Sequence, residues 1–205
     1  MARIGIFSGT FDPVHTGHIA FALAAVTTGK LDRVVLLPES EPRGKQQVSP
    51  LPQRLAMLQL AVADYPSLEV LELGGRRFNV NDTLPELIQR YPGDSLSLLL
   101  GSDVVETFTY RWPGLERLLR AMELLIAVRS QQSRAEVEQR LQSLEQAYPG
   151  VRVRYVFVDS AHSYVASSQV RMTRTNASEL LPPAVAMYIA THQLYKDDPH
   201  AKMPS

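Results

Sequence analysis

Short apolar runs recur along the chain, and amphipathic stretches separate them. Strands are predicted at these runs, which occupy residues 4–7, 33–38, 68–73, 96–100, 124–128 and 151–158. Most of the runs are continuously apolar, which is typical of parallel strands covered on both faces. The sixth run alternates Arg152 and Arg154 with apolar residues, so it predicts a strand with one more polar side.

The stretches between the runs carry apolar residues at helical spacing. Helices are expected after His18, from Pro52 to about Tyr65, from about Asn81, after Ser133, near Ser167 and after Pro182. The second of these helices places Leu55, Leu58 and Val62 on one apolar stripe.

Capping signals and element order extend this prediction to a fold class. Ser133 and Glu136 form a capping box, and either Asn81 or Asp82 can cap the helix that begins near residue 81. The alternation of strands and helices predicts an α/β domain with a Rossmann-like, mostly parallel sheet and right-handed crossovers. The chain lacks the G-x-G-x-x-G pattern of dinucleotide-binding folds.

Composition narrows the class of protein. The chain has 205 residues, 45% of them hydrophobic, so we expect one domain over residues 1–195 and a flexible polar tail over 196–205. Lys plus Arg and Asp plus Glu number 21 each, which gives no bulk field that favours nucleic acid or membranes as partners. The absence of cysteine excludes disulfides, thiolate metal sites and a cysteine nucleophile. No signal-peptide pattern or long apolar run is present, so a cytoplasmic enzyme is expected.

The most informative stretch runs from Gly9 to His18, where a predicted strand feeds a turn that opens a helix. A helix N-terminus offers unpaired N–H groups and a partial positive charge, which together favour a phosphate. Gly9 and Gly17 allow close backbone approach or a positive φ. His15 and His18 are three residues apart and therefore share a face of the first helical turn, where they can donate hydrogen bonds to polyphosphate oxygens.

Further polar residues follow the carboxyl ends of predicted strands, the edge where open α/β sheets bind ligands. Lys45 lies in the polar loop after the second strand, and Arg54 lies in the first turn of the next helix, where a cation opposes the helix dipole and indicates a ligand or a carboxylate partner. Asp103 follows Gly101 at the end of the fourth strand, where its carboxylate can accept hydrogen bonds from ribose hydroxyls or cap the following helix.

Two more features have both a structural and a functional interpretation. Trp112 is the only tryptophan and lies in a turn, where it can anchor the core or stack on a planar heterocycle. Ser167 and Ser168 stand at a predicted helix start with Arg171 one turn later, so they can cap that helix or form a second anion cradle.

Residues 9–18 resemble the GxFxPxHxGH signature of the nucleotidylyltransferase superfamily. Residues 165–171 resemble the Ile-Ser-Ser-Thr-x-Ile-Arg motif of the same family, with Ala166 in place of the first serine and Ser168 in place of the threonine. Over residues 3–195 the chain is similar to bacterial nicotinate mononucleotide adenylyltransferases.

This resemblance implies a role for each candidate residue. For the ATP side it implies His15, His18 and Arg171 as the groups that act on the phosphates, with Gly9, Thr10, Phe11, Gly101, Asp103, Ser167 and Ser168 as further contacts. For the side of the acceptor mononucleotide it implies Lys45, Arg54, Val80, Asp82, Thr83 and Trp112. Val80 stands where the family has a threonine beside the carboxyl group of the pyridine, although backbone N–H groups at that helix start can still bind a carboxylate.

The implied reaction transfers AMP from ATP to the phosphate of nicotinate mononucleotide, giving deamido-NAD and pyrophosphate. Mg²⁺ is expected to enter with the triphosphate, since the sequence shows no dedicated metal cluster. The alternatives are nicotinamide mononucleotide or another phosphorylated acceptor such as pantetheine phosphate, and a nucleotide-binding regulator without turnover. ATP and a pyridine mononucleotide are the expected ligands, and a homo-oligomer is a possible assembly.

Overall fold

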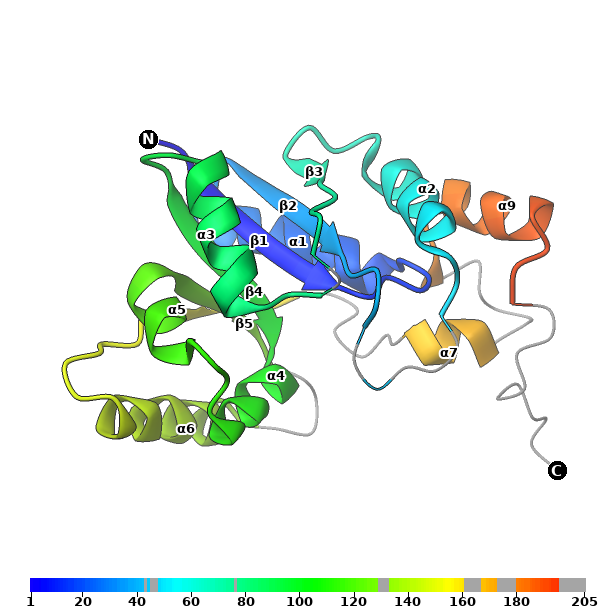
Figure 1. Ribbon diagram of the computed structural model, residues 1–205. Helices are drawn as coiled ribbons and strands as arrows, with labels where there is room; N and C mark the ends of the chain where they lie inside the picture. Colours follow the sequence, from blue (N-terminus) through cyan, green and yellow to red (C-terminus); the bar gives the residue numbers. More distant parts are fainter. Residues whose placement is uncertain are drawn as a thin grey trace, which may run out of the picture.

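Six parallel strands form one sheet in the order β3-β2-β1-β4-β5-β6, with helices on both faces (Figure 1). The structure is a computed structural model that describes residues 1–42, 44, 48–75, 77–128, 133–160, 167–172 and 180–195. The strands are β1 Arg3–Gly9, β2 Arg33–Pro38, β3 Leu68–Val70, β4 Ser95–Gly101, β5 Glu123–Ala127 and β6 Tyr155–Phe157. The predicted parallel α/β fold is confirmed, and each of the six strands overlaps one of the predicted apolar runs.

The two edge strands are shorter than the apolar runs that predict them. β3 and β6 each have a single neighbour in the sheet, β2 and β5 respectively. Before β6, the N–H of Val153 donates to Glu145 Oε1 at 2.7 Å, so a side chain takes the place of a neighbouring strand. Val151 and Val153 are nevertheless buried in the core. The apolar pattern at residues 151–153 therefore reports burial rather than strand pairing.

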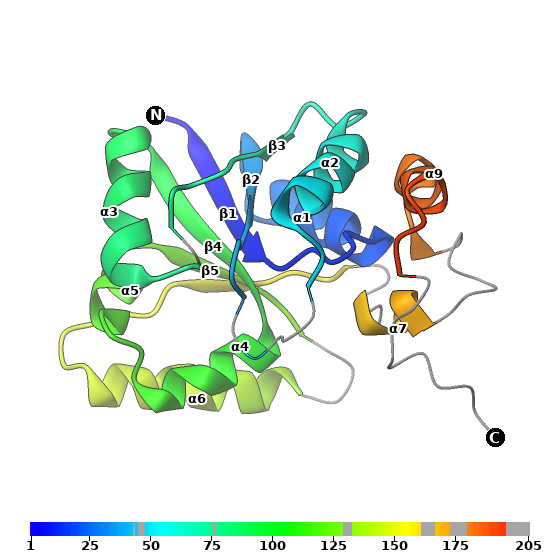
Figure 2. The same ribbon diagram turned by 45° about the vertical axis from the view of Figure 1, so that its right-hand side comes forward.

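Two hydrophobic cores lie on opposite faces of the sheet. One face is covered by α3 (Val80–Arg90), α4 (Ser102–Thr107), α5 (Leu115–Ala121) and α6 (Arg134–Ala147). The other is covered by α1 (Thr16–Thr28), α2 (Leu51–Val62) and α9 (Pro183–Thr191), with α7 (Ser167–Met172) beside them (Figure 2). Successive side chains of a strand point to opposite faces, so Val35 lies in the first core and Leu36 in the second.

The helix caps agree with the sequence at one helix and differ at another. The Ser133–Glu136 capping box is formed and opens α6, as predicted, while Val137 and Leu141 face the core. Helix α3 is capped by Asn79 rather than by Asn81 or Asp82, since the Asn79 side chain accepts the N–H of Asn81 at 2.9 Å. The helix therefore begins two or three residues earlier than those caps imply.

The stripe of α2 that faces the core differs from the predicted one. Its buried residues are Arg54, Met57, Leu58 and Ala61, at positions i, i+3, i+4 and i+7. The predicted stripe shares only Leu58 with this set. The reason is that an arginine occupies a core-facing position, which an apolar pattern does not register.

A short helical segment between β4 and β5 is not predicted by the apolar runs. It consists of α4, the 3₁₀ turn η1 (Phe108–Tyr110) and α5. Leu115, Leu118 and Leu119 face the core at helical spacing, so the signal for α5 was present over fewer than two turns. Within the described residues, no helix combines the length and the apolar character needed to cross a membrane.

Candidate active site

The carboxyl ends of β1 and β4 lie side by side at the centre of the sheet. The chain leaves β1 toward β2 on one side, whereas β4 and β5 extend the sheet on the other, so the strand order reverses between β1 and β4. In open α/β sheets a crevice forms at such a reversal and binds ligands. Gly9 ends β1 and Gly101 ends β4, which places both predicted motifs at this crevice.

The turn after β1 is held in shape by aromatic packing. Phe11 has φ of 49° and is buried, with its ring edge-on to Phe7 at 5.3 Å and to His18 at 5.0 Å between centroids. A Cβ on Gly9 would lie 3.1 Å from the Phe11 ring. Gly9 therefore makes room for Phe11, and it does not adopt a positive φ. The Asp12–Pro13 peptide that follows is cis.

His15 and His18 lie together at the start of α1, as their spacing predicts. His15 is the N-cap residue, and the two imidazole rings stack with centroids 3.6 Å apart and planes inclined by 28°. The N–H of His15 donates to Nδ1 of His18 at 3.2 Å. Because Nδ1 accepts, the neutral His18 ring carries its proton on Nε2. That proton is suited to an anion bound at the helix start.

The motif that contains Ser167 and Arg171 contacts the turn that carries the histidines, although more than 150 positions separate them along the chain. Ser167 Oγ donates to the carbonyl oxygen of Pro13 at 3.1 Å, and Arg171 Nη1 donates to the carbonyl oxygen of Asp12. The first residue of α7 and its single arginine thus both contact the turn that carries the histidines. The side chain of Ser168 and the whole of Lys45 lie outside the described residues.

Arg54 is placed beneath the site rather than facing a ligand. Its side chain is 1% exposed. Its guanidinium donates to the carbonyl oxygens of Thr10 (2.7 Å), Glu39 (2.8 Å), Ser49 (2.8 Å) and Ser40 (3.3 Å). Burial lowers the pKa of this guanidinium, and the neighbouring Asp12 opposes that shift. The expected direct contact of Arg54 with an acceptor is therefore replaced by a role in holding two loops together, because its donors already bind backbone.

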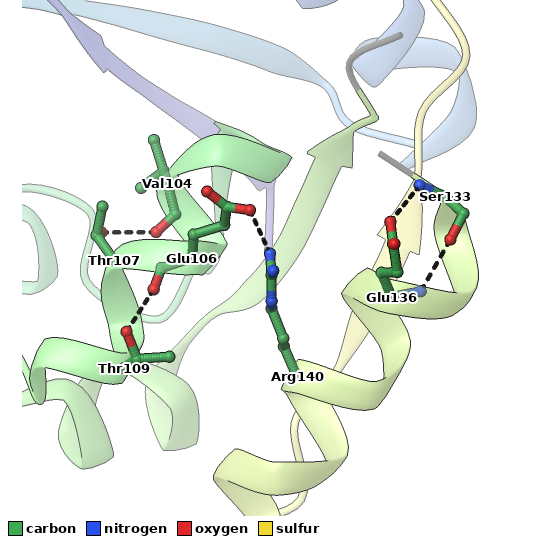
Figure 3. A network of polar contacts seen from close by, with 7 residues as sticks. All are labelled: Val104, Glu106, Thr107, Thr109, Ser133, Glu136 and Arg140. Atoms are coloured by element: carbon green, nitrogen blue, oxygen red, sulfur yellow. Dashed lines mark hydrogen bonds and ion pairs between the residues drawn. The ribbon is translucent and has the colours of Figure 1, made fainter. Parts of the chain in front are cut away.

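Asp103 lies at the start of α4, beside the end of β4. The N-cap of α4 is Gly101, and Asp103 is an exposed residue of the first turn, so the capping interpretation of Asp103 is wrong. The position of α4 is secured against α6 by an ion pair in which Arg140 Nη1 lies 2.6 Å from Glu106 Oε1 (Figure 3). Asp103 thus lies two residues after the end of β4, on a helix that also contacts α6 through this ion pair.

The residues implied for the acceptor side divide between the helix cap and the core. Thr83 Oγ1 accepts the N–H of Asn79 at 3.0 Å, and Asp82 Oδ2 accepts from Asn79 Nδ2 at 2.8 Å. Val80 is 2% exposed and packs in the core against Gly114. The first turn of α3 is bonded to its own cap, since the N–H of Asn81 donates to the Asn79 side chain and the N–H groups of Asp82 and Thr83 donate to the Asn79 carbonyl oxygen.

Trp112 lies in the turn between η1 and α5, as predicted. Its ring is half-buried and edge-on to Phe108, with centroids 5.0 Å apart. Gly114, two residues later, has φ of 82°, and a Cβ there would lie 2.6 Å from Asn81 Oδ1. The turn that carries Trp112 thus packs directly on the start of α3.

Glu39 is a site residue that the sequence analysis missed. It directly follows β2, and its Oε1 accepts the N–H of Phe78 at 3.1 Å and the hydroxyl of Ser8 at 3.4 Å. With Ser8, Arg77 and Thr83 it lines a small pocket at the carboxyl edge of the sheet. The signal that could have identified Glu39 was an acidic residue directly after a buried strand.

A second cavity, of about 250 Å³, lies around Tyr91 and Asp94 and contains none of the predicted site residues.

The switch point of the parallel sheet thus carries stacked histidines at a helix start, joined by a distant serine and arginine. The family model described as "Cytidylyltransferase-like" matches residues 6–173. A protein of Dehalococcoides mccartyi named "Probable nicotinate-nucleotide adenylyltransferase" is 32% identical over 202 residues, which cover 94% of this chain and 97% of that protein. The chain therefore belongs to the cytidylyltransferase-like family, among the relatives named nicotinate-nucleotide adenylyltransferases.

Solved structures support the same fold. The nicotinic acid mononucleotide adenylyltransferase of Plasmodium falciparum, complexed with NaAD, superposes with a TM-score of 0.75 at 17% sequence identity, covering 95% of this chain and 98% of that one. A second structure of that protein, complexed with APC, gives a TM-score of 0.73 at 16% identity and the same coverages.

Proposed function

We propose that this protein transfers the AMP moiety of ATP to nicotinate mononucleotide, releasing pyrophosphate and forming deamido-NAD. The observation that carries the proposal is the meeting of His15, His18 and Arg171 at one turn of the switch-point crevice. The name and the near-complete coverage of the D. mccartyi relative support the choice of acceptor. The NaAD and APC complexes of the P. falciparum protein support a crevice that accepts both substrates.

The proposed reaction requires alignment rather than a protein nucleophile. An oxygen of the acceptor phosphate attacks the α-phosphorus of ATP, and the bond from that phosphorus to the bridging oxygen of the pyrophosphate breaks. Both reactants are anions, so the protein must hold them in line and neutralise the charge that develops on the phosphoryl oxygens. His18 Nε2–H and the N–H groups at the start of α1 are donors of the right type for this task.

Arg171 and Asp103 complete the ATP side of the proposal. The guanidinium of Arg171 binds the carbonyl of Asp12 through Nη1, and its fork geometry suits the leaving pyrophosphate. Asp103, exposed at the start of α4, is assigned to the ribose hydroxyls. Mg²⁺ belongs to this scheme as part of the substrate, bound to the triphosphate. Because ATP is the donor, we also assign the reaction to the cytoplasm.

On the acceptor side, Trp112 is assigned to stack on the pyridine ring. Its indole lies in a turn that packs on the start of α3, and planar heterocycles bind well to such a half-buried aromatic face. The start of α3, which carries the positive end of the helix dipole, is assigned to the carboxylate of the nicotinate, since a helix N-terminus favours an anion. Lys45 is assigned to the phosphate of the mononucleotide on the family pattern alone.

The test is pyrophosphate release from MgATP with nicotinate mononucleotide, nicotinamide mononucleotide and pantetheine phosphate offered separately. We expect turnover with nicotinate mononucleotide and at least about tenfold lower kcat/KM with the nicotinamide form, which lacks the charge that a helix N-terminus favours. Equal rates with both pyridine nucleotides would remove the assigned role of α3. ATP binding without turnover on all three would favour a nucleotide-binding regulator.

A further inference from the structure

Asp12 is a buried carboxylate to which the proposed reaction assigns no task. It stands in the turn between β1 and α1, three residues before His15, and is 3% exposed. Its Oδ1 accepts the hydroxyl of Tyr195 at 2.6 Å, and its Oδ2 accepts the N–H of Ser49 at 3.2 Å. A buried carboxylate is costly unless its oxygens are bonded in this way. Asp12 therefore ties the turn to two other parts of the chain.

Tyr195 comes from the other end of the protein. It lies in the turn that follows α9, with φ of 62°. Burial raises the pKa of the Tyr195 hydroxyl, and the charge of Asp12 raises it further, whereas the bond to Ser49 and the charge of Arg171 act in the opposite direction. The hydroxyl is therefore protonated at neutral pH and is available as a donor to Asp12. A hydrogen bond from a neutral donor to a charged acceptor is among the stronger ones in proteins.

The same turn is bonded from several directions. Leu180, just before α9, accepts the hydroxyl of Thr16 at 3.1 Å through its carbonyl oxygen. Ser167 and Arg171 of α7 bind the carbonyls of Pro13 and Asp12. These contacts reach backbone oxygens or the edge of α1, whereas Tyr195 acts on the Asp12 side chain. The Tyr195 hydroxyl thus binds the same carboxylate that joins the histidine-bearing turn to Ser49, in the segment that precedes α2.

We propose that Tyr195 is a positioning residue for the transfer reaction, acting through Asp12 on the turn that carries His15 and His18. The kinetic consequence rests on the proposed function, because it presumes that the turn aligns ATP with an acceptor. The structural consequence does not, because it concerns only the conformation of the turn. The two can therefore be measured separately.

The kinetic experiment compares Tyr195→Phe with Tyr188→Phe, which removes a hydroxyl from α9 in the same C-terminal segment. For Tyr195→Phe we expect kcat to fall roughly 10- to 100-fold, the scale of a small misplacement of reacting groups, with the KM for ATP within about threefold of the unmodified protein. Tyr188→Phe should leave both within about twofold. A Tyr195→Phe protein with unchanged kcat, or with KM alone altered, would overturn the assignment.

A double-mutant cycle with Asp12→Ala identifies the path of the effect. Without the carboxylate the hydroxyl has nothing to hold, so Tyr195→Phe should lower kcat by less than about twofold in the Asp12→Ala background. An undiminished effect there would show that Tyr195 acts by another route. A Tyr195→Phe chain that is unfolded by circular dichroism at 10 °C would replace the positioning role with a folding role.

A readout independent of turnover is the ¹⁵N–¹H spectrum of the protein without substrates. Tyr195→Phe should shift the amide signals of Asp12, of residues 14–19 and of Ser49, whereas Tyr188→Phe should not. Unmoved amide signals would overturn the proposal even if activity fell. If the unmodified protein turned over none of the acceptors while these amides shifted in Tyr195→Phe, the proposed function would fail and the positioning of the turn by Tyr195 would stand.

Discussion

The two sides of the central crevice are built by different kinds of contact. On the ATP side, the turn over residues 10–16 is bonded to Arg54, Ser167, Arg171 and Tyr195, which lie 44 to 183 positions along the chain from their partners. On the acceptor side, Asn79 bonds to residues two to four positions away, and Arg117 of α5 adds bonds to Val80 and Asn81 from 37 and 36 positions away. The ATP side therefore depends on more distant contacts than the acceptor side, where local bonds contribute a larger share.

This difference fits what each side has to do in the proposed reaction. The phosphates of ATP need donors at fixed positions, and many distant tethers prevent the turn from relaxing. The acceptor side needs to recognise one ring and one charged group, which a few residues near a helix start can accomplish.

The largest effect on the ATP side is expected when Arg54, the buried cation beneath it, is replaced. Arg54→Met should lower the free energy of unfolding by about 3–5 kcal/mol, because the carbonyl acceptors lose their donor and Asp12 loses a neighbouring positive charge. Urea unfolding measures the change. Arg120→Met is the control, since Arg120 is half-exposed and its ion pair with Glu116 contributes about 1 kcal/mol or less. Equal losses for the two variants would contradict the assigned role of Arg54.

The next largest effect concerns chemistry rather than stability. His18→Ala should lower kcat by ~100-fold, the scale for one preorganised donor, while the Tm falls by less than about 4 °C. His192→Ala, an exposed histidine after α9, should leave kcat within about twofold. Pyrophosphate release and thermal unfolding are the two measurements. An unchanged kcat for His18→Ala would remove His18 from the mechanism.

A smaller change should separate the acceptor side from the ATP side. Trp112→Ala should raise the KM for the mononucleotide ~10-fold and leave the KM for ATP within about twofold, because the lost interaction is ring stacking. Tyr110→Ala is the matched aromatic control, since that side chain is 82% exposed. If both KM values rose equally in Trp112→Ala, the tryptophan would be a packing residue of the turn.

The smallest expected effect tests how far the scaffold influences the site. Arg140→Met breaks the ion pair that ties α6 to α4, but both partners are partly exposed. Stability should therefore change by about 1 kcal/mol or less, and the KM for ATP should rise by no more than about threefold through the position of Asp103. Titration of ATP by calorimetry checks this. A tenfold loss of affinity would mean that α4 depends on this bond for its position.

Features of the fold that depend on residues close together in the sequence could be predicted, whereas those that depend on distant residues could not. β2 was predicted at its observed bounds because both of its faces are buried, with Val35 in one core and Leu36 in the other, so its residues form a continuously apolar run. The α6 cap was predicted because Ser133 and Glu136 bond within one turn. The stripe of α2 was not, because Arg54 is buried by partners in three other segments.

The sequence by itself determined the parallel α/β sheet, the strand–turn–helix with two histidines and the second motif around Arg171. Each depends on patterns shorter than about twenty residues, in which burial periodicity and backbone chemistry are visible locally. Tertiary structure alone decided that Arg54 supports the site from beneath, that Val80 packs in the core and that Tyr195 reaches Asp12. Those outcomes depend on which distant groups satisfy a buried polar atom, and hydrogen-bond partners far apart in the chain leave no local pattern.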